Sequence, residues 1–313
     1  MGRARDKLRK FTGIVRDTTA LARAFVTSKR PVYQAQHAVL QATSFRRRNL
    51  PPSESKILEV ISAGKASPPA SAAIVKSLID RLHRTRDAYV AMKCLYTVHA
   101  VLQSGSLDAK RELLNYRGRN FLIMATFRDK TDSDAWELSS WVRWYASVIE
   151  QELQVSWVIS FSFFINGNPA TRKRMMGNGV CDMATSDMIN GLRTLVVLVE
   201  LISDAPLSLQ QTAFVDEVIR LLSYDYGLTQ KEILLMMEEV EKRADNLDYE
   251  EIGKAADLLN RLHACKGKLG SLFLNKNRHD AYWEKMADIS NNFALTLKQR
   301  TDSMRLVVYG SRP

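Results

Sequence analysis

Apolar residues recur every three or four positions along most of the chain, which is the spacing of one face of an α-helix. The first stretch with this pattern is residues 11–25, and its apolar face consists of Phe11, Ile14, Val15, Thr18, Leu21, Ala22 and Phe25. Further helices are expected at about 33–43, 53–64, 67–84, 87–105, 107–115, 133–163, 186–203, 209–223, 229–244, 248–274 and 279–302. Alternating strand patterns are nearly absent, and FLIMATF at 121–127 is the one run that resembles a strand. About ten helices with short links predict an all-α fold, an α-solenoid or an irregular helical bundle.

Several of these helices carry recognisable capping residues. Ser53 is expected to cap the helix that Gly64 ends, and two prolines follow Ser67 in a first turn that tolerates them. Gly105 is expected to end the helix at 87–105. That helix is apolar nearly all round, which predicts a central helix with neighbours on every side.

The positive charge is concentrated near the beginning of the sequence. The formal net charge is +11, and residues 1–48 hold twelve lysines and arginines against only Asp6 and Asp17. The other residues are nearly neutral, with 33 basic and 32 acidic side chains. This asymmetry indicates an anionic partner, either a membrane surface or a nucleic acid, that meets the basic segment.

Catalytic and metal-binding motifs are absent from the sequence. It contains no P-loop, dinucleotide-binding fingerprint, zinc-protease motif or nucleophile elbow, and its five histidines are scattered singly. His99 lies within the apolar helix, which favours a buried core histidine over a catalyst. The three cysteines are far apart, which suits reduced thiols in a cytosolic protein. We therefore expect a binding protein rather than an enzyme, with no catalytic residue, metal or cofactor.

Membrane insertion by a spanning helix and secretion are not expected. The longest apolar runs have about half of the ~20 residues that a bilayer-spanning helix needs. The basic N-terminus is not followed by an apolar core of signal-peptide length.

Two separated stretches carry a family resemblance. The first contains Arg84-Thr85-Arg86, then Ala91-Met92-Lys93-Cys94-Leu95 and His99, and the second contains Phe127-Arg128-Asp129 and the pattern W-x-x-S-x-W-V-R-x-Y from Trp136 to Tyr145. Together they resemble the central helices of the ANTH domain, an ENTH/VHS-like domain of clathrin assembly proteins, particularly those of plants. Similar length and helix order extend the resemblance more weakly over most of the chain. It implies an ANTH-like fold and a role in clathrin-coated vesicle formation and endocytosis.

The resemblance also implies a lipid-headgroup site. ANTH domains of this kind bind phosphatidylinositol 4,5-bisphosphate through a cluster written K-A-T, six residues, then P-[PK]-K-x-K-H. In this sequence Gln41 replaces the first lysine, the intervening stretch is two residues longer, and Lys56 alone keeps a positive charge among the later positions. Three arginines inside the lengthened turn offer bidentate donors to phosphate instead. The expected headgroup-binding residues are Arg46, Arg47, Arg48, Lys56, Lys29, Arg30 and His37, and the alternative is a solvated loop.

The basic N-terminal helix offers a second contact with a membrane surface. Its expected contact residues are Arg5, Lys7, Arg9 and Lys10. The apolar face of this helix is expected to pack on the following helices as the first element of the solenoid. The alternative is that Leu8, Phe11, Val15 and Phe25 insert into the headgroup layer.

Two other classes of function stay open. A nucleic-acid binder fits the basic segment, but Phe45 is the only aromatic residue in 41–56 and no nucleic-acid-binding motif is present, so this partner is not expected. A protein-interaction scaffold that has lost its lipid site is the other alternative. The resemblance implies that the C-terminal helices bind vesicle SNAREs and that a long tail recruits clathrin and adaptor complexes. Because methionine side chains are flexible, Leu235 and Met236 are the candidate SNARE groove, and the alternative is that this apolar surface packs the helices together. Because the sequence contains no clathrin or adaptor motif, we expect direct clathrin recruitment to be weak.

The predicted organisation has three parts. A basic amphipathic helix covers residues 1–30, an ANTH-like helical domain covers 31–303, and a short C-terminal tail covers 304–313. The protein is expected to be a monomer at the cytosolic face of membranes, in clathrin-coated pits or vesicles of the Golgi apparatus or the plasma membrane.

Overall fold

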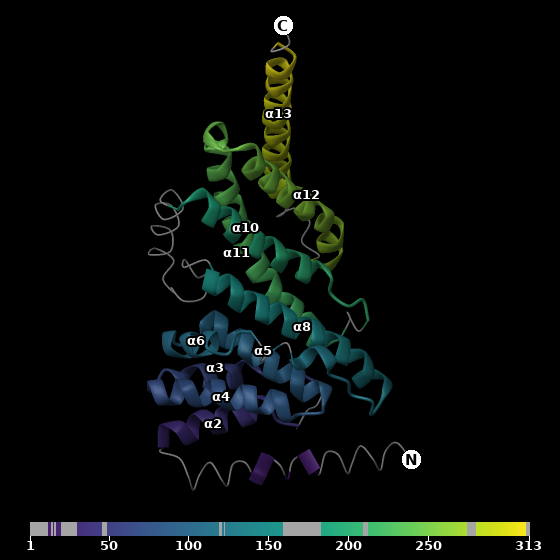
Figure 1. The fold of residues 1–313 in the computed structure, drawn as a ribbon. Coiled ribbons are helices and arrows are strands. Elements are labelled where there is room, and N and C mark those ends of the chain that lie inside the picture. The colour runs from purple at the N-terminus through teal and green to yellow at the C-terminus, as the bar shows by residue number, and fades with distance from the viewer. Residues whose placement is uncertain are drawn as a thin grey trace. The chain divides into compact units, whose positions relative to one another are not determined.

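The computed structural model describes residues 12–13, 15, 17–19, 30–45, 49–118, 121, 123–158, 183–208, 212–273 and 280–310, the last nine by their backbone only. Helices form all the regular structure in this part of the chain, so the all-α prediction is confirmed (Figure 1). The chain divides into two compact units. Unit 1 consists of residues 1–157, 162–167 and 206–218, and unit 2 consists of residues 158–161, 168–205 and 219–313.

Unit 1 is a stack of antiparallel helices built around one central helix. Its helices are α2 (Arg30–Ala42), α3 (Glu54–Gly64), α4 (Pro68–Arg84), α5 (Ala88–Ser104), α6 (Leu107–Leu114), the 3-10 helix η1 (Ile123–Thr126) and nearly all of α8 (Ser133–Val158). Helix α2 packs on α3 and α4, and α5 packs on α3, α4 and α6 (Figure 1). Every residue of α5 from Ala88 to Leu102 is buried, which confirms the predicted central helix.

Local sequence explains where the helices of unit 1 begin and end. The Ser67 hydroxyl accepts a backbone hydrogen bond at the start of α4, and the Asp87 carboxylate does the same for α5. Gly105 ends α5, and a Cβ atom at this position would lie 2.4 Å from the Val101 carbonyl oxygen. Ser53 occupies the N-cap position of α3 as predicted, but its side chain makes no capping hydrogen bond.

Unit 2 contains α10 (Thr185–Ser203), most of α11 (Ala213–Lys242), the 3-10 helix η2 (Ala244–Asn246), α12 (Tyr249–Leu272) and α13 (Asp280–Gly310). Helix α12 packs on both α10 and α13. It begins with a capping box formed by Asp248 and Glu251, and Arg261 ties it to α10 through two hydrogen bonds of 2.8 Å to Glu200. The apolar residues of α12 are buried, which closes this helix against its neighbours, and they include Ile252, Ala255, Leu259, Leu262 and Leu269.

Two predicted helix boundaries are wrong. The separate helices expected at 209–223 and 229–244 form the single helix α11, which passes through Gly227. The Thr229 hydroxyl donates to the Asp225 carbonyl at 2.9 Å, and the Gln230 amide donates to the Tyr226 hydroxyl at 3.0 Å, so side-chain bonds run across the predicted break. Helix α13 continues to Gly310 rather than ending at 302. The predicted domain boundaries at residues 30 and 303 stay predictions.

Smaller expectations can also be compared with the structure. The described residues between 12 and 19 are helical, and within FLIMATF Phe121 is helical and Ile123–Thr126 form the 3-10 helix η1, so the described residues of this run contain no strand. Cys94 and Cys265 are buried free thiols, whereas Cys181 lies outside the described residues. Within the described ranges, no helix combines the length and the apolar character that a bilayer crossing requires.

Glycine 227 provides a test of the continuous helix α11. A Cβ atom at Gly227 would meet no heavy atom within 4 Å, so alanine fits there without strain. We expect Gly227→Ala to raise the free energy of unfolding by about 1 kcal/mol, because alanine has the higher helix propensity. Denaturant titration followed by circular dichroism measures this change. Gly105→Ala is the control with the opposite expected sign, and it should destabilise the protein because its Cβ would clash with the Val101 carbonyl. If Gly227→Ala lowered the free energy of unfolding, the continuous helix through Gly227 would be contradicted.

Candidate functional site

The predicted lipid site centres on the α2–α3 turn, residues 43–53, which links the last residue of α2 to the first residue of α3. Arg46, Arg47 and Arg48 lie outside the described residues, so the site is built from the segments that flank them. After the arginines, Asn49 and Leu50 are exposed, while Pro52 is buried. Two proline rings restrict the backbone at this point, so the second half of the turn is stiff.

Three cationic side chains hold the first half of the α2–α3 turn. The ammonium groups of Lys56 and Lys93 donate to the Gln41 and Ser44 carbonyls, and the Arg81 guanidinium donates to the Thr43 carbonyl, each at 3.0 Å. These three residues, here called the three-cation cluster, come from α3, α4 and α5. Gln41 lies in the last turn of α2, where carbonyls have no intrahelical partner and carry partial negative charge, so Lys56 stabilises this helix end. The Thr43 and Ser44 carbonyls follow the helix and are satisfied by Arg81 and Lys93.

The N-terminal segment anchors the same turn from another direction. One oxygen of Asp17 lies 2.8 Å from the Arg81 guanidinium, and the other accepts the Phe45 backbone N–H at 3.4 Å. Phe45 is buried, and a Cβ atom at Gly13 would lie 2.9 Å from its ring, so glycine permits this close approach. The backbone of residues 43–45 is therefore fixed immediately before the arginine run.

Burial and like charge both act on the three-cation cluster. Lys93 is only 3% exposed, and this burial lowers the pKa of its ammonium to about 8, with further lowering by Lys56 and Arg81 and an opposing effect of Asp87. Burial raises the pKa of the neighbouring Cys94 thiol to about 12, so this cysteine is neutral and unreactive at pH 7. Concentrated positive charge beside a turn suits the binding of an anion rather than bond-making chemistry.

The structure brings only some of the predicted headgroup residues together. Lys56 contacts Gln41, so the two ends of the predicted basic pattern are adjacent in space. His37 is half-buried and lies one helical turn before Gln41, on the same face of α2. Arg30 is exposed in the first turn of α2, roughly 16 Å along the helix axis from Gln41 at 1.5 Å per residue. Arg30 therefore lies at the opposite end of α2 from Lys56.

Several predicted contact residues lie outside the described residues, namely Lys29, Arg5, Lys7, Arg9 and Lys10, in addition to the arginine run. Their roles stay predictions. In unit 2, Leu235 is 36% exposed, but Met236 is completely buried. Met236 is a core residue because it lies on the inner face of α11, so Leu235 alone of the predicted pair offers a surface.

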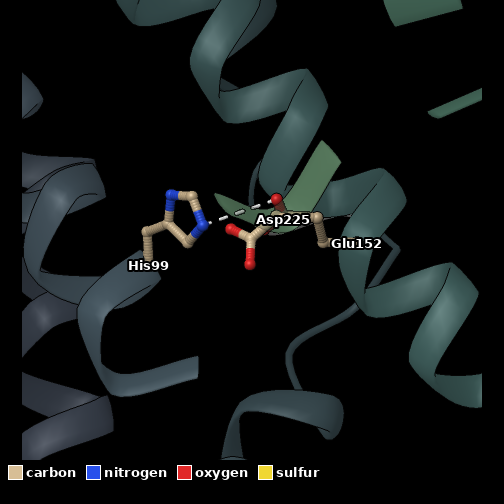
Figure 2. A group of neighbouring side chains, drawn as sticks. All are labelled: His99, Glu152 and Asp225. Carbon is tan, nitrogen blue, oxygen red and sulfur yellow. Dashed lines mark ion pairs between the residues drawn. The ribbon is translucent and has the colours of Figure 1, made fainter. Parts of the chain in front are cut away.

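The residues that carry the family resemblance form hydrogen bonds inside unit 1. His99 and Glu152 face each other without solvent exposure, with His99 Nε2 3.5 Å from Glu152 Oε1 (Figure 2). His99 Nδ1 lies 2.6 Å from the Tyr145 hydroxyl, as predicted for a buried core histidine. The Asp129 carboxylate accepts the Ala88 N–H at 2.9 Å, at the start of α5. These residues join α5 to α8 and to the turn that precedes α8.

Sequence reasoning missed Asp17, Arg81 and Lys93 as parts of the site. Arg81 and Asp17 are far apart in the sequence, so their pairing has no local signal. Lys93 did carry a signal, because a lysine within a helix that is apolar all round must find a buried hydrogen-bond partner. The identity of that partner, Ser44, depends on tertiary structure.

Comparisons with known proteins agree with the fold. A family model described as the ANTH domain matches residues 34–204. An Arabidopsis thaliana protein named “Putative clathrin assembly protein” is 30% identical over 270 residues, which are 83% of this chain and 73% of that protein. A second Arabidopsis protein of the same name is 35% identical over 151 residues, 48% of this chain and only 23% of that longer protein.

A solved structure has a similar arrangement of helices. It is the ENTH domain of epsin-2 in complex with phosphatidylinositol 4,5-bisphosphate, with a TM-score of 0.52 and 15% identity. The alignment covers 81% of this chain and 95% of that domain. At 15% identity, this similarity shows that the two proteins share a fold.

The contact of Asp17 with Arg81 predicts how firmly the N-terminal segment is attached. Asp17→Asn should lower the free energy of unfolding by about 1–2 kcal/mol, because the half-buried guanidinium loses its charged partner. Hydrogen exchange of residues 12–19 and of Phe45 should become faster. Glu59→Gln, which neutralises an exposed acid on α3, is the control and should change neither quantity. Unchanged exchange in Asp17→Asn would mean that this segment is held by other contacts.

Proposed function

Because the chain belongs to the ANTH domain family, we propose that it is a phosphoinositide-binding adaptor that takes part in clathrin-coated vesicle assembly and endocytosis. The observation that carries the proposal is the anchored, cation-rich base of the α2–α3 turn, which leads directly into three arginines. The names of the relatives and the headgroup bound by the epsin-2 domain support the same class of function. The protein would act at the cytosolic face of coated pits or vesicles, at the plasma membrane or the Golgi apparatus.

The proposed ligand is the inositol headgroup of phosphatidylinositol 4,5-bisphosphate. Arginine forms paired hydrogen bonds with phosphate oxygens, and a backbone fixed beforehand reduces the entropy that is lost on binding. Each basic residue near an anionic leaflet contributes about 1 kcal/mol. Arg46, Arg47, Arg48 and Lys56 would therefore support moderate membrane affinity, with His37 at the edge of the site.

Nucleic acid is the competing anionic partner, because lipid and nucleic-acid phosphates attract the same cations. Single-stranded nucleic acid is usually held by exposed aromatic rings on which bases stack. Phe45, the aromatic residue of the turn, is only 5% exposed and packs inside unit 1. The described part of the turn therefore favours a lipid headgroup.

The arginine run provides the direct test. Changing Arg46, Arg47 and Arg48 to alanine should lower affinity for vesicles containing phosphatidylinositol 4,5-bisphosphate by at least about tenfold, because three headgroup contacts are lost. Co-sedimentation measures this change, with vesicles of phosphatidylserine alone and of other phosphoinositides in parallel. Binding should also weaken as salt rises, since exposed charges are screened beyond roughly 8 Å at physiological ionic strength.

A variant with the same loss of charge serves as the control. Lys65 at the C-cap of α3, Arg111 on α6 and Lys254 on α12 are exposed bases. Their combined change to alanine should leave sedimentation nearly unchanged. Equal losses in the two variants would indicate attraction by net charge without a site. Binding of DNA or RNA in a mobility-shift assay that exceeds binding to these vesicles would favour the nucleic-acid alternative.

The protein partners proposed from the family are clathrin, adaptor complexes and vesicle SNAREs. For a SNARE helix, the described surface offers Leu235 on α11, next to buried Met236 and Met237. An amphipathic helix binds by placing its apolar side chains against such a surface.

Leu235 allows a clean test of SNARE binding. Leu235→Glu should abolish capture of a vesicle-SNARE fragment while the melting temperature stays nearly constant, because the residue is partly exposed. Leu295→Glu, at a leucine that is 58% exposed on α13, is the matched control and should retain capture. Retained capture by Leu235→Glu would exclude this surface, and the phosphoinositide function would stand without it.

A further inference from the structure

The central helix α5 carries one feature that the fold alone does not require. Lys93 is 3% exposed within a helix whose residues 88–102 are all buried. Burying an ammonium group is costly unless it is hydrogen-bonded, and an apolar side chain of similar volume is often at least as stable in such a position. A lysine here therefore calls for a role that an apolar residue could not perform.

We propose that Lys93 is a positioning residue for the headgroup site, which it serves by holding the Ser44 carbonyl at the base of the arginine-bearing turn. This proposal rests on the proposed function. Lys93 Nζ lies 3.0 Å from the Ser44 oxygen, and Ser44 precedes Arg46 by two residues. The adjacent Thr43 is fixed as well, because its hydroxyl donates to Val39 at 2.7 Å and its carbonyl accepts from Arg81.

The charges around Lys93 make its protonation sensitive to a bound anion. It faces Lys56 on α3, Arg81 on α4, and Asp87 and Cys94 on its own helix, while Asp17 of the N-terminal segment pairs with Arg81. The two neighbouring cations disfavour its charged form, in addition to burial. An anionic headgroup at the turn would offset this repulsion, so bound headgroup and protonated Lys93 stabilise each other.

This coupling has a definite sign. The pKa of Lys93 is lowered to about 8, so the free protein begins to lose this proton just above neutral pH. Bound anion raises the pKa of Lys93, so binding near pH 8 takes up protons and affinity falls as pH rises from 7 to 9. Titration of the ligand's own phosphates would instead raise the affinity as pH rises, because a phosphate monoester with a second pKa near 6 only gains negative charge.

A second buried lysine provides a matched control. Lys110 on α6 is 5% exposed, and its ammonium donates to the Gln103 carbonyl at 3.1 Å. Lys93→Met and Lys110→Met thus each remove a buried ammonium and its hydrogen bond to a carbonyl, but only Lys93 holds the α2–α3 turn. Denaturant titration of both variants separates lost stability from lost binding.

The experiment measures binding of soluble inositol 1,4,5-trisphosphate and of phosphatidylinositol 4,5-bisphosphate vesicles to the full chain at pH 7, 8 and 9. Wild-type affinity should fall three- to tenfold from pH 7 to pH 9, and calorimetry in buffers of different ionisation enthalpy should detect proton uptake near pH 8. Lys93→Met should bind about tenfold more weakly at pH 7, without the pH dependence or the proton uptake. Lys110→Met should behave like the wild type. Lys93→Arg, which stays charged, should remove the pH dependence and retain affinity.

The possible outcomes distinguish a failure of the role of Lys93 from a failure of the proposed function. A wild-type protein that binds neither probe at pH 7 would overturn the proposed function and the role of Lys93 together. Wild-type binding that is independent of pH, with equal affinity in Lys93→Met, would overturn the role of Lys93 alone. Equal losses of affinity in Lys93→Met and Lys110→Met would show that only general stability is involved, which also overturns it.

Discussion

Helix α5 is buried on every side, so each polar side chain along it must find a hydrogen-bond partner inside the protein. This constraint organises unit 1. Lys93 reaches the backbone after α2, and His99 reaches Tyr145 on α8. At the start of the helix, Asp129 accepts the Ala88 N–H and so fixes the turn before α8. The proposed headgroup site and the residues of the family pattern therefore depend on the same central helix.

The residues shared with the family are largely structural, which explains why they identify the fold better than the ligand. His99 and Tyr145 contact each other at 2.6 Å in the interior, and Arg143 donates to the Phe127 carbonyl at 3.0 Å. Such residues would be needed whatever the domain binds. In the proposed function the ligand depends instead on the α2–α3 turn, where this sequence departs from the family pattern at Gln41 and places arginines in the lengthened stretch.

The sequence predicted the features that depend on nearby residues. The prolines in the first turn of α4, the end of α5 at Gly105 and the all-round burial of α5 follow from local chemistry and periodicity, and all were confirmed. The break predicted near Gly227 was wrong, because tertiary packing and side-chain bonds outweigh the low helix propensity of one glycine. The three-cation cluster could not be predicted, because its bonds join residues 15 to 49 positions apart. Likewise, the adaptable side chain of methionine favoured Leu235 and Met236 as a groove, but only the structure shows that Met236 is buried and that Leu235 is exposed.

Because both ends of the α2–α3 turn are fixed by the surrounding helices, its sequence can vary within the family. Both sides of the insertion are held by residues outside it: Lys56, Arg81 and Lys93 bind the carbonyls before it, and buried Pro52 follows it. A loop whose ends are fixed by the surrounding scaffold can change in length at little entropic cost. If the proposed site is correct, substitutions between Ser44 and Pro52 would alter which anion it prefers while the helices keep their packing.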